Sequence, residues 1–389
     1  MSLEAIVQRC QQIVEDNTFA WAREWKERHP RGGVMGYWPV YTPVEIIHAA
    51  GMLPLAVYGG GNNLEVKHAD SRLPSFICSI PRTSMELAFT GRLDFLEGLL
   101  FHPICDVARN LAQVWRRNFN TGKVDLLYLP QNIVTGAAVH YIHDEYQRLR
   151  GTLEEMTRKK ITKAALKRSL HLYNRQRQLI RELYTIRHEA PWLLATAECY
   201  VLVRAGTLMA VEEHLPLLEQ ALQEVRQRSA RSMDKIRVVF EGGFCEQPPV
   251  EFIQVVEEVC YIVDDDFMIG ARWFQGDVPE EGDPVEALAR SYRDLMSYCS
   301  IQHDERRLKH LALLERVRGS GAQAVILCPP KFCEPGLDDQ VHFSQSLDTE
   351  KIPILSMEFE EKMTSFEQVR IQVETFAESI LFYAGEGVR

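Results

Sequence analysis

The sequence predicts an α/β protein in which two doubly wound parallel-sheet domains flank a cleft and are connected by a helical segment. Three observations predict this class. Short, almost wholly apolar stretches alternate with amphipathic ones in residues 1–137, and the same alternation returns in residues 233–389. Strands that are buried on both faces of a parallel sheet have this near-continuous apolar composition. Residues 138–232, in contrast, contain no strand-like stretch, so we expect helices there.

The first 137 residues supply the first alternation. Residues 1–30 have the spacing of an amphipathic helix or helix pair. Pro39 and Pro43 then punctuate an extended entry. A helix over 44–50 should end at Gly51. Beyond it we expect strands over 53–59, 76–80, 98–105 and 123–130, and helices over 85–93 and 106–119.

The helical segment and the second alternation follow. In 138–232 we expect helices over 140–160, 161–189, 195–209 and 216–230, with Thr162 as an N-cap and Pro191 as a break. From 233 onwards we expect a strand that starts near 235, a helix and a strand within 249–267, helices over 283–299 and 303–321, strands within 322–335 and 351–360, and a last helix over 365–383. No internal repeat or low-complexity segment interrupts this order.

Composition excludes several classes of function. The chain has 389 residues and a formal net charge of −10, with no basic cluster large enough for a nucleic-acid footprint. Its apolar runs are far shorter than the roughly 20 residues of a membrane helix. The N-terminal residues carry charges at helical spacing, unlike a secretory signal. Nine scattered cysteines favour reduced thiols and ligands over a disulfide framework, so we expect a cytoplasmic protein.

Three cysteines carry the strongest functional signal. Cys78, Cys105 and Cys333 each end a short apolar run and are each followed by residues that turn the chain. Side chains at the carboxyl ends of parallel strands converge on the ligand crevice, so these three thiols predict a metal or cluster site between the two α/β halves. Three protein ligands are one short of the usual four for an iron–sulfur cluster, which leaves one iron open. Three buried small side chains, or a zinc site, are the alternatives.

The remaining cysteines are weaker candidates. Cys328 precedes Cys333 closely and could replace it as a ligand, although a packed position inside the strand fits better. Cys245 follows a double glycine at another strand exit and could also approach a ligand. The other four lie within expected helices or strands and are predicted to be structural: Cys10, Cys199, Cys260 and Cys299.

Polar residues close to the three cysteines in the sequence each allow a functional and a structural interpretation. His102 stands three residues before Cys105 and could donate a proton or a hydrogen bond to a bound ligand, or could simply be a satisfied histidine. Arg82 and Lys331 flank the cysteines and could offset negative charge. Residues 59–61 could let the backbone approach a phosphate, but we prefer to interpret them as a turn. Residues 264–266 could bind a cation, but we prefer to interpret them as the polar end of a strand.

Three segments carry a resemblance to a known family. They are GYWPVYTPVEIIHAAGMLPLAVYGGG, FICSIPRTSMELAFTGRLDFLEGLLFHPICDVARN and VILCPPKFCEPGLDD. They resemble the 2-hydroxyacyl-CoA dehydratase/benzoyl-CoA reductase family, and the resemblance covers nearly the whole chain. The stretch IRVVFEGGFCEQPPVEFIQVVEEVCYIVDDDFMIGARWF is similar to the smaller cluster-binding subunit, gamma or C, of the ATP-dependent reductases in that family.

The resemblance implies a cofactor and a site. Each of two related subunits of such a complex holds one [4Fe–4S] cluster through three cysteines, which match Cys78, Cys105 and Cys333 here. The open iron position would face the cleft that receives the acyl-CoA substrate. Family members often carry a single cysteine at the exit of the late strand, whereas this chain has both Cys328 and Cys333. No thioester-cleaving triad is visible in the sequence.

The resemblance also implies partners and a reaction. The partners would be a related cluster-binding subunit (beta or B), activator subunits (alpha and delta) with an actin-like ATPase fold, and ferredoxin as the electron donor. ATP hydrolysis in the activator would drive electrons into this module, where benzoyl-CoA is reduced to cyclohexa-1,5-diene-1-carbonyl-CoA. The alternatives are a subunit of a radical 2-hydroxyacyl-CoA dehydratase, which is redox-neutral, and a non-catalytic subunit that relays electrons or supports assembly.

Overall fold

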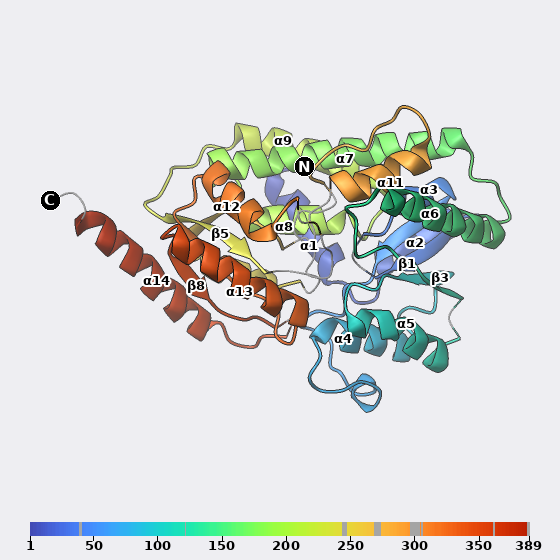
Figure 1. Ribbon diagram of the computed structural model, residues 1–389, viewed down its shortest axis with the longest axis horizontal. Coiled ribbons are helices and arrows are strands. Elements are labelled where there is room, and N and C mark those ends of the chain that lie inside the picture. The colour runs from blue at the N-terminus through green and yellow to red at the C-terminus, as the bar shows by residue number, and fades with distance from the viewer. Residues whose placement is uncertain are drawn as a thin grey trace.

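Two four-stranded parallel sheets form the framework of the protein in a computed structural model (Figure 1). The structure describes residues 1–38, 41–120, 122–242, 247–267, 274–295, 304, 306–360 and 362–386. The strand orders are β2-β1-β3-β4 and β6-β5-β7-β8. The strands are β1 (Gly33–Tyr37), β2 (Met52–Ala56), β3 (Gly98–Phe101), β4 (Lys123–Leu126), β5 (Ile236–Glu241), β6 (Cys260–Asp265), β7 (Ala324–Leu327) and β8 (Ile354–Ser356). Both sheets are therefore doubly wound, which confirms the predicted α/β class.

The helices that cover the sheets follow the predicted alternation in most places. Their bounds are α1 (Leu3–Glu15), α2 (Ala20–Arg28), α3 (Val44–Ala49), α4 (Ser79–Phe89), α5 (Asp106–Asn118), α6 (Gly136–Thr157), α7 (Lys163–Glu189), α8 (Thr196–Ala205), α9 (Val211–Gln227), α10 (Val250–Val259), α11 (Pro284–Asp294), α12 (Lys309–Ser320), α13 (Glu334–Thr349) and α14 (Glu367–Glu386). A single turn of 3₁₀ helix, η1, spans Ala69–Ser71. As predicted, the Thr162 side chain caps α7, where it accepts a hydrogen bond from Ala165 N at 3.1 Å.

The central strand β1 was not predicted. It pairs with both β2 and β3, so it lies at the middle of the first sheet. Its sequence, GVMGY, contains two glycines, and glycine in a strand interior usually weakens the strand. Here the missing side chain has a packing reason. A Cβ at Gly36 would lie 2.8 Å from methyl groups of Leu96 and Leu99, so a larger residue there would force these side chains to shift.

The predicted strand over 76–80 is wrong. No strand lies there; the segment between β2 and α4 is a long loop that contains η1, and α4 begins at Ser79. The short apolar run of this segment contains Phe76, whose side chain is 70% exposed. Ile77 and Ile80 are buried, so the run contains core residues without being a strand.

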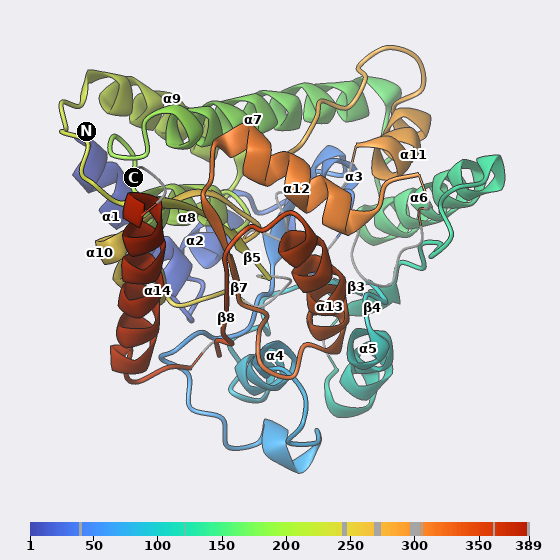
Figure 2. The same ribbon diagram turned by 60° about the vertical axis from the view of Figure 1, so that its left-hand side comes forward.

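The helical segment connects the two sheets through shared packing. Helix α7 contacts α9, α3 and β6, and therefore reaches elements of both α/β halves. Elements from outside the segment join it: α1 packs on α8 and α9, and α11 packs on α6 (Figures 1 and 2). One cluster of buried apolar side chains runs from the N-terminal helices to α14. The division into domains at 137 and 232 stays a prediction.

The acidic strand exit at 264–266 is occupied by protein groups. Asp264 accepts a hydrogen bond from Arg316 Nε at 2.9 Å, and Asp265 forms an ion pair of 2.5 Å with Arg187. Asp266 accepts a hydrogen bond from Gly242 N at 2.8 Å. The neighbouring guanidinium of Arg316 holds the pKa of Asp264 well below its usual range, against the effect of burial. The preferred reading, a polar strand exit, agrees with these contacts.

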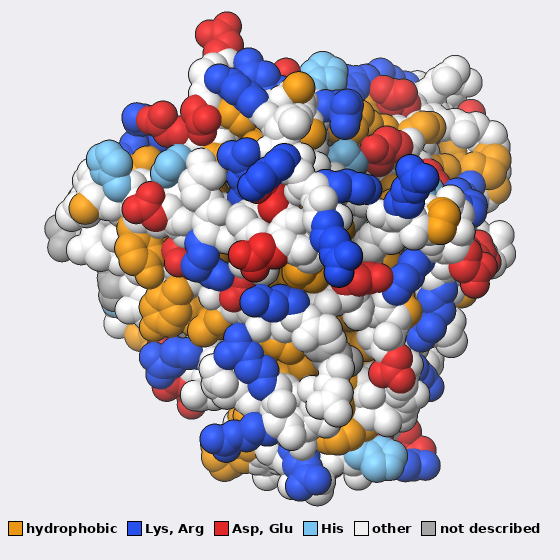
Figure 3. Space-filling view, turned by 90° about the vertical axis from the view of Figure 1, so that its right-hand side faces the viewer, with side chains coloured by type: hydrophobic (Ala, Val, Ile, Leu, Met, Phe, Trp, Pro, Cys, Tyr) orange, Lys and Arg blue, Asp and Glu red, His pale blue; other side chains and the backbone are white. Residues whose placement is uncertain are grey.

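The surface of the helical segment mixes charges of both signs. Arg175 pairs with Glu219 at 3.0 Å and Arg181 pairs with Asp277 at 2.6 Å. Figure 3 shows Lys and Arg side chains interleaved with Asp and Glu on one face of the molecule. These arginines of α7 therefore lie at the surface with acidic partners of their own. Within the described residues, no helix combines the length and apolar character that crossing a membrane requires.

Candidate functional site

The three predicted cysteines line one cavity of about 260 Å³. Each occupies the N-cap position of a helix: Cys78 precedes α4, Cys105 precedes α5 and Cys333 precedes α13. Figure 2 shows α4 and α5 in the lower part of the molecule, with α13 above them. The structure therefore brings together thiols from three distant segments and from both α/β halves.

The topology explains two of the three positions. In the first sheet the strand order reverses at β1 and β3, and ligands of open α/β sheets bind beyond the carboxyl ends of the strands at such a point. Trp38 directly follows β1, and Cys105 follows β3 after a short turn; both line the cavity. Cys333 follows β7, which pairs with the first strand of the second sheet. Cys78 instead comes from the loop after β2, and not from the strand predicted over 76–80.

The helix N-termini set the electrostatics of the cavity. A helix carries partial positive charge at its first turn, where N–H groups have no partner within the helix. At α5 one of these groups is used: Ala108 N donates a hydrogen bond to Cys105 Sγ at 3.3 Å. Thiolates are stabilised at helix N-termini for the same reason. Three such termini around one cavity favour negatively charged sulfur ligands.

A strained turn places Cys333. Its N–H donates to Pro330 O at 3.0 Å, and Lys331 N–H donates to Phe359 O at 2.8 Å, which fixes the turn against the loop after β8. Phe332, the third residue of the turn, has a φ of 62°. A side chain in the left-handed region costs about 1–2 kcal/mol. The turn therefore holds Cys333 at the cavity in spite of a backbone cost.

This strain predicts an unusual order of stability between two variants. Phe332→Gly and Phe332→Ala both remove the ring, but only glycine adopts a positive φ without cost. We expect the free energy of unfolding of Phe332→Gly to exceed that of Phe332→Ala by about 1 kcal/mol. Urea denaturation followed by circular dichroism measures the difference. Equal stabilities, or a more stable alanine variant, would contradict the strained turn.

Apolar groups form most of the remaining cavity wall. Trp38 is 3% exposed and stacks near Phe101, with ring centroids 5.9 Å apart. Phe76 and Phe332 lie at the cavity too, but their side chains are 70% and 43% exposed. Exposed large apolar side chains beside a cavity are typical of a surface that binds a ligand or a partner. Sequence patterns had not marked Trp38 or these two phenylalanines, because single aromatic residues carry no signal of their own.

Cys328 differs from Cys333 in its surroundings. The Cys328 side chain is fully buried in the core at the end of β7, and its N–H donates to Glu241 O at 2.7 Å. Burial raises the pKa of the Cys328 thiol well above its usual range. It is not among the residues that line the cavity, whereas Cys333 is. The geometry thus favours Cys333 of the two as a ligand.

The other cysteines have no role at this cavity in the described structure. Cys10, Cys199 and Cys260 are buried, and burial raises the pKa of each thiol, to about 11, 12 and 12 respectively. Such thiols are inert packing groups, as predicted. Cys245 and Cys299 lie outside the described residues.

His102 is buried next to the site but does not line the cavity. Its side chain is 2% exposed, and Nδ1 lies 3.2 Å from Leu127 O, to which it can only donate. Nε2 then carries a lone pair, and it has no hydrogen-bond partner among the described residues. Burial lowers the pKa of His102 to about 4, so the ring is neutral at pH 7. In this state Nε2 accepts protons, and it has none to donate; the role predicted for His102 as a donor stays untested.

Two buried histidines predict a pH dependence of stability. His214 is also fully buried, with Nε2 2.8 Å from Leu202 O, and burial lowers its pKa to about 4. In the unfolded chain these rings take up a proton near pH 6.5, whereas in the folded chain they do so only near pH 4. The free energy of unfolding therefore falls as the pH drops from 6.5 to 4. Each histidine accounts for about 3 kcal/mol at the low end of the window, at 1.36 kcal/mol for each pH unit.

The measurement is urea denaturation between pH 7.5 and 4. His214→Gln should unfold more easily at pH 7.5 but show a weaker loss of stability on acidification. His171→Gln serves as a control, because the His171 ring is exposed and its ion-pair partner, Glu280, is partly exposed. If His214→Gln left the dependence of the free energy of unfolding on pH unchanged, His214 would not be buried in its neutral form.

A second cavity of about 250 Å³ adjoins the first and shares Cys105 with it. Its wall is more polar and includes Asp106, Arg109, Glu334 and Asp338. Asp106 and Arg109 form an ion pair of 2.6 Å across one turn of α5. Three carboxylates and one guanidinium leave this side of the cysteine site with excess negative charge.

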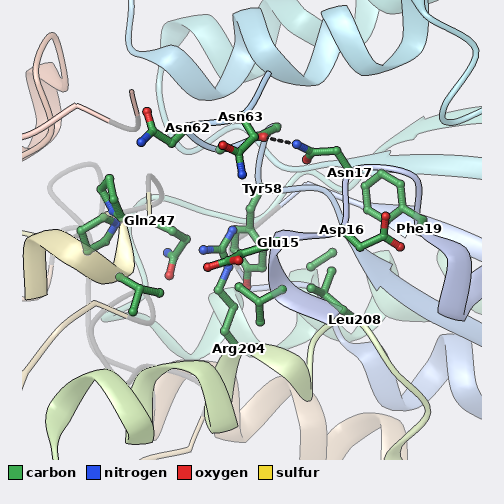
Figure 4. Close-up of a pocket in the computed structure, with 18 of the residues that line it drawn as sticks. Glu15, Asp16, Asn17, Phe19, Tyr58, Asn62, Asn63, Arg204, Leu208 and Gln247 are labelled. Atoms are coloured by element: carbon green, nitrogen blue, oxygen red, sulfur yellow. Dashed lines mark hydrogen bonds between the residues drawn. The ribbon is translucent and has the colours of Figure 1, made fainter. Parts of the chain in front are cut away.

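The glycine segment 59–61 lines a different pocket, of about 110 Å³, between the end of β2 and the start of α10 (Figure 4). Asn17 Nδ2 donates to Gly60 O at 2.5 Å, and the Arg204 side chain reaches the same pocket. The other charged groups there are carboxylates: Glu15, Asp16 and Glu251. Their excess negative charge disfavours a phosphate, so the preferred reading as a turn agrees with the pocket.

The two basic residues that flank the cysteines are engaged elsewhere. Arg82 forms an ion pair of 2.7 Å with Asp70, and Lys331 forms one of 2.7 Å with Glu360. Neither side chain lines the cavity of the cysteines. The structure therefore gives no support to the expectation that they offset negative charge at the site.

The donor set fits a cluster better than a single ion. Across the described ranges, no three His, Cys, Asp or Glu side chains form a group that could hold one metal ion. The three cysteines nevertheless surround one cavity. Iron–sulfur clusters take thiolate ligands, and a cubane of four irons needs each thiolate at a different iron, so its ligands are spread apart.

Comparison with known proteins decides the family. The model of the family described as "2-hydroxyglutaryl-CoA dehydratase, D-component" matches residues 39–380. The chain belongs to this family. The matched range includes Cys78, Cys105 and Cys333, so the whole cysteine site lies within the part of the chain that defines the D-component family.

Individual relatives are similar over nearly their whole length. The chain is 40% identical to the benzoyl-CoA reductase subunit designated C in Thauera aromatica, over 99% of this chain and 100% of that protein. It is 29% identical to lactoyl-CoA dehydratase subunit beta of Anaerotignum propionicum, over 90% of this chain and 92% of that protein. It is also 29% identical to (R)-2-hydroxyglutaryl-CoA dehydratase subunit beta of Acidaminococcus fermentans, over 89% of this chain and 92% of that protein. These proteins are subunits of reductases and dehydratases that act on CoA thioesters.

Proposed function

We propose that this D-component family protein is the gamma (C) subunit of a benzoyl-CoA reductase complex and holds a [4Fe–4S] cluster through Cys78, Cys105 and Cys333. The observation that carries the proposal is the convergence of these three thiols on one cavity. The higher identity to a benzoyl-CoA reductase subunit than to the dehydratase subunits supports the reductase assignment.

The residues of the cavity have separate tasks in this proposal. The three thiolates hold the cluster, and the first turns of α4, α5 and α13 stabilise their negative charge. When bound, the cluster supplies electrons one at a time at low potential. Trp38 and Phe332 exclude water and offer an apolar surface to an aromatic ring or acyl chain. His102 stays neutral behind this wall, where its Nε2 can accept a proton.

The partners follow from the energy that the reaction needs. Reduction of an aromatic ring requires a very negative potential, and this sequence contains no recognisable nucleotide-binding motif. The energy therefore comes from other subunits: ATP-hydrolysing activators with an actin-like fold that receive electrons from ferredoxin. The module that binds the acyl-CoA substrate is completed by a related beta (B) subunit, and the complex works in the cytoplasm.

The test is an anaerobic assay of the complex purified with its co-expressed partner subunits. Benzoyl-CoA, a low-potential electron donor and ATP are supplied, and the products are identified by mass spectrometry. The proposal expects a diene-carbonyl-CoA, with two electrons consumed for each product. Formation without ATP, or no consumption of benzoyl-CoA by an intact iron–sulfur complex, would contradict it.

The dehydratase relatives justify one parallel assay. The same preparation is given 2-hydroxyacyl-CoA thioesters, such as those of lactate and 2-hydroxyglutarate. Loss of water without net electron consumption would assign the chain to the dehydratases instead. Electron transfer to a partner cluster, without turnover of either class of substrate, would favour a subunit that only relays electrons.

A further inference from the structure

A groove of about 660 Å³ lies at the amino-terminal edge of the first sheet. It is formed by the loop before β1, the start of β2, the turn between α6 and α7, and the start of α9. The cysteine cavity lies beyond the other end of β1, where Trp38 follows the strand. The five residues of β1, roughly 17 Å long at 3.3 Å per residue, separate Trp38 from Gly32 in the wall of the groove. The groove is therefore a separate site.

Basic side chains outnumber carboxylates in this groove. Glu213 pairs with Arg28 at 3.0 Å, and Glu212 pairs with His48 Nε2 at 2.9 Å. Both carboxylates that line the groove are thus engaged by a basic partner. Across the ranges that the structure describes, no ion pair joins a carboxylate to the other three cations of the groove, which are Arg31, Lys159 and Arg168. Three cations gathered without matching carboxylates favour the binding of an anion.

Glu212 does not neutralise this excess. The hydrogen bond from His48 holds the pKa of Glu212 below its usual range, and the charge of Arg168 acts in the same direction. One ionised carboxylate is therefore shared between two basic groups. Other arginines of α7 differ in this respect, because Arg175 and Arg181 each have an acidic partner of their own.

The backbone places two of the three cations side by side. The ammonium of Lys159 lies 3.5 Å from Arg31 O, although 128 positions separate these residues in the sequence. Ile161, with 1% of its surface exposed, anchors the turn that carries Lys159. The Gly32 N–H donates to His29 O at 2.7 Å and closes the turn that carries Arg31. Turns that are fixed before a ligand arrives lose less conformational freedom when it binds.

The remaining wall of the groove is aromatic and apolar. The rings of Trp25 and His29 stack, with centroids 4.3 Å apart and planes inclined by 18°. Pro30 and Met52 line the groove as well. A concave site of this size, with an apolar wall and a few convergent charged groups, is typical of small-ligand sites. The groove thus fits a small molecule better than the flat surface of another protein.

The number and type of the cations indicate the anion. A guanidinium donates two parallel hydrogen bonds to a phosphate, and a lysine ammonium adds a point charge. A single carboxylate on a ligand would be satisfied by one of these groups. Two guanidinium groups and one ammonium instead match the larger charge of linked phosphate groups.

We propose that this groove binds a small molecule that carries two or more phosphate groups, and that Arg31, Lys159 and Arg168 contact its phosphate oxygens. The proposal is independent of the proposed function, because it needs neither the cluster nor the cysteine cavity. A free nucleotide and the nucleotide part of CoA share this chemistry, so the experiment has to distinguish them. The competing explanation is that the three cations are solvated surface groups without a ligand.

The experiment is isothermal titration calorimetry of the full-length chain at constant ionic strength. Pyrophosphate, ADP and CoA are separate titrants, and adenosine is the control that lacks phosphate. We expect Arg168→Gln and Lys159→Gln each to weaken binding about tenfold or more, because each removes a charge-assisted hydrogen bond. Arg175→Gln removes an equal charge from α7 outside the groove, and should leave the affinity unchanged. Tighter binding of ADP or of CoA than of pyrophosphate identifies the source of the phosphates.

Three outcomes would overturn the proposal. One is that the folded wild-type chain binds none of the phosphate-bearing titrants at millimolar concentration. Another is that Arg175→Gln weakens binding as much as Arg168→Gln, which would indicate attraction by net charge alone. The third is that adenosine binds as tightly as ADP. Circular dichroism confirms that each variant is folded, and if Arg168→Gln is not, Lys159→Gln decides.

Discussion

Cys333→Ser should abolish the iron–sulfur centre of this subunit. The anaerobically purified wild-type complex should contain about four irons and four acid-labile sulfides for this chain, as one cubane requires. The variant should lose them together with reductase activity, because a serine hydroxyl is a poor replacement for a soft thiolate. Cys333 lines the cavity. The hydrogen bond from its N–H to Pro330 O involves only the backbone, so the substitution should change the sulfur ligand and leave the turn in place.

Cys328→Ser is the matched control for this prediction. Its thiol is fully buried at the end of β7, away from the cavity lining, so the cluster content should stay unchanged. The variant should only lose stability, by about 1–3 kcal/mol, because a hydroxyl replaces a packed thiol in the core. The reverse pattern, with iron lost from Cys328→Ser and kept in Cys333→Ser, would make Cys328 the third ligand. Zinc in place of iron would refute the cluster altogether.

Asp265→Asn should destabilise the protein by about 3–5 kcal/mol, the range for breaking a buried ion pair by removing one partner. Arg187 and Asp265 are 1% and 2% exposed, and their atoms Nη1 and Oδ2 lie 2.5 Å apart. The substitution leaves the Arg187 guanidinium buried without its counter-charge. Because a guanidinium is not deprotonated in proteins, Arg187 cannot escape this cost by losing its proton.

The position of this ion pair makes its effect large. Arg187 belongs to α7 of the helical segment, and Asp265 ends β6 of the second sheet. Arg187 Nη2 also donates to Ile262 O at 2.8 Å, so one side chain fastens the long helix to the strand. The weakened contact should lower the midpoint of urea unfolding and expose α7 to proteolysis first.

An exposed ion pair of α7 provides the control. Glu219→Gln removes the partner of Arg175, whose side chain is 43% exposed, and should change the free energy of unfolding by less than about 1 kcal/mol. The double variant Arg187→Met with Asp265→Leu should recover part of the stability lost in Asp265→Asn, because it removes both charges at once. Equal effects of Asp265→Asn and Glu219→Gln would show that the buried pair contributes no more than a surface one.

The sequence by itself was sufficient to predict the fold class and the convergence of three cysteines, Cys78, Cys105 and Cys333, on one cavity. Strands such as β5 and β7 are buried on both faces, so their apolar composition is visible without knowledge of any neighbour. Cys105 and Cys333 follow such strands closely, and the chain order alone places them at a carboxyl end. These predictions depend on local composition and on a general property of parallel sheets.

The tertiary structure decided those features that depend on packing against residues distant in the sequence. Strand β1 is central although its glycines argue against it, because Leu96 and Leu99 need the space at Gly36. Cys78 reaches the cavity as the first residue before α4, although no strand leads into it. In the same way, only the packing of β7 distinguishes the buried Cys328 from the cavity residue Cys333. Local sequence specifies which groups are present, whereas their distances result from long-range packing, which no short segment encodes.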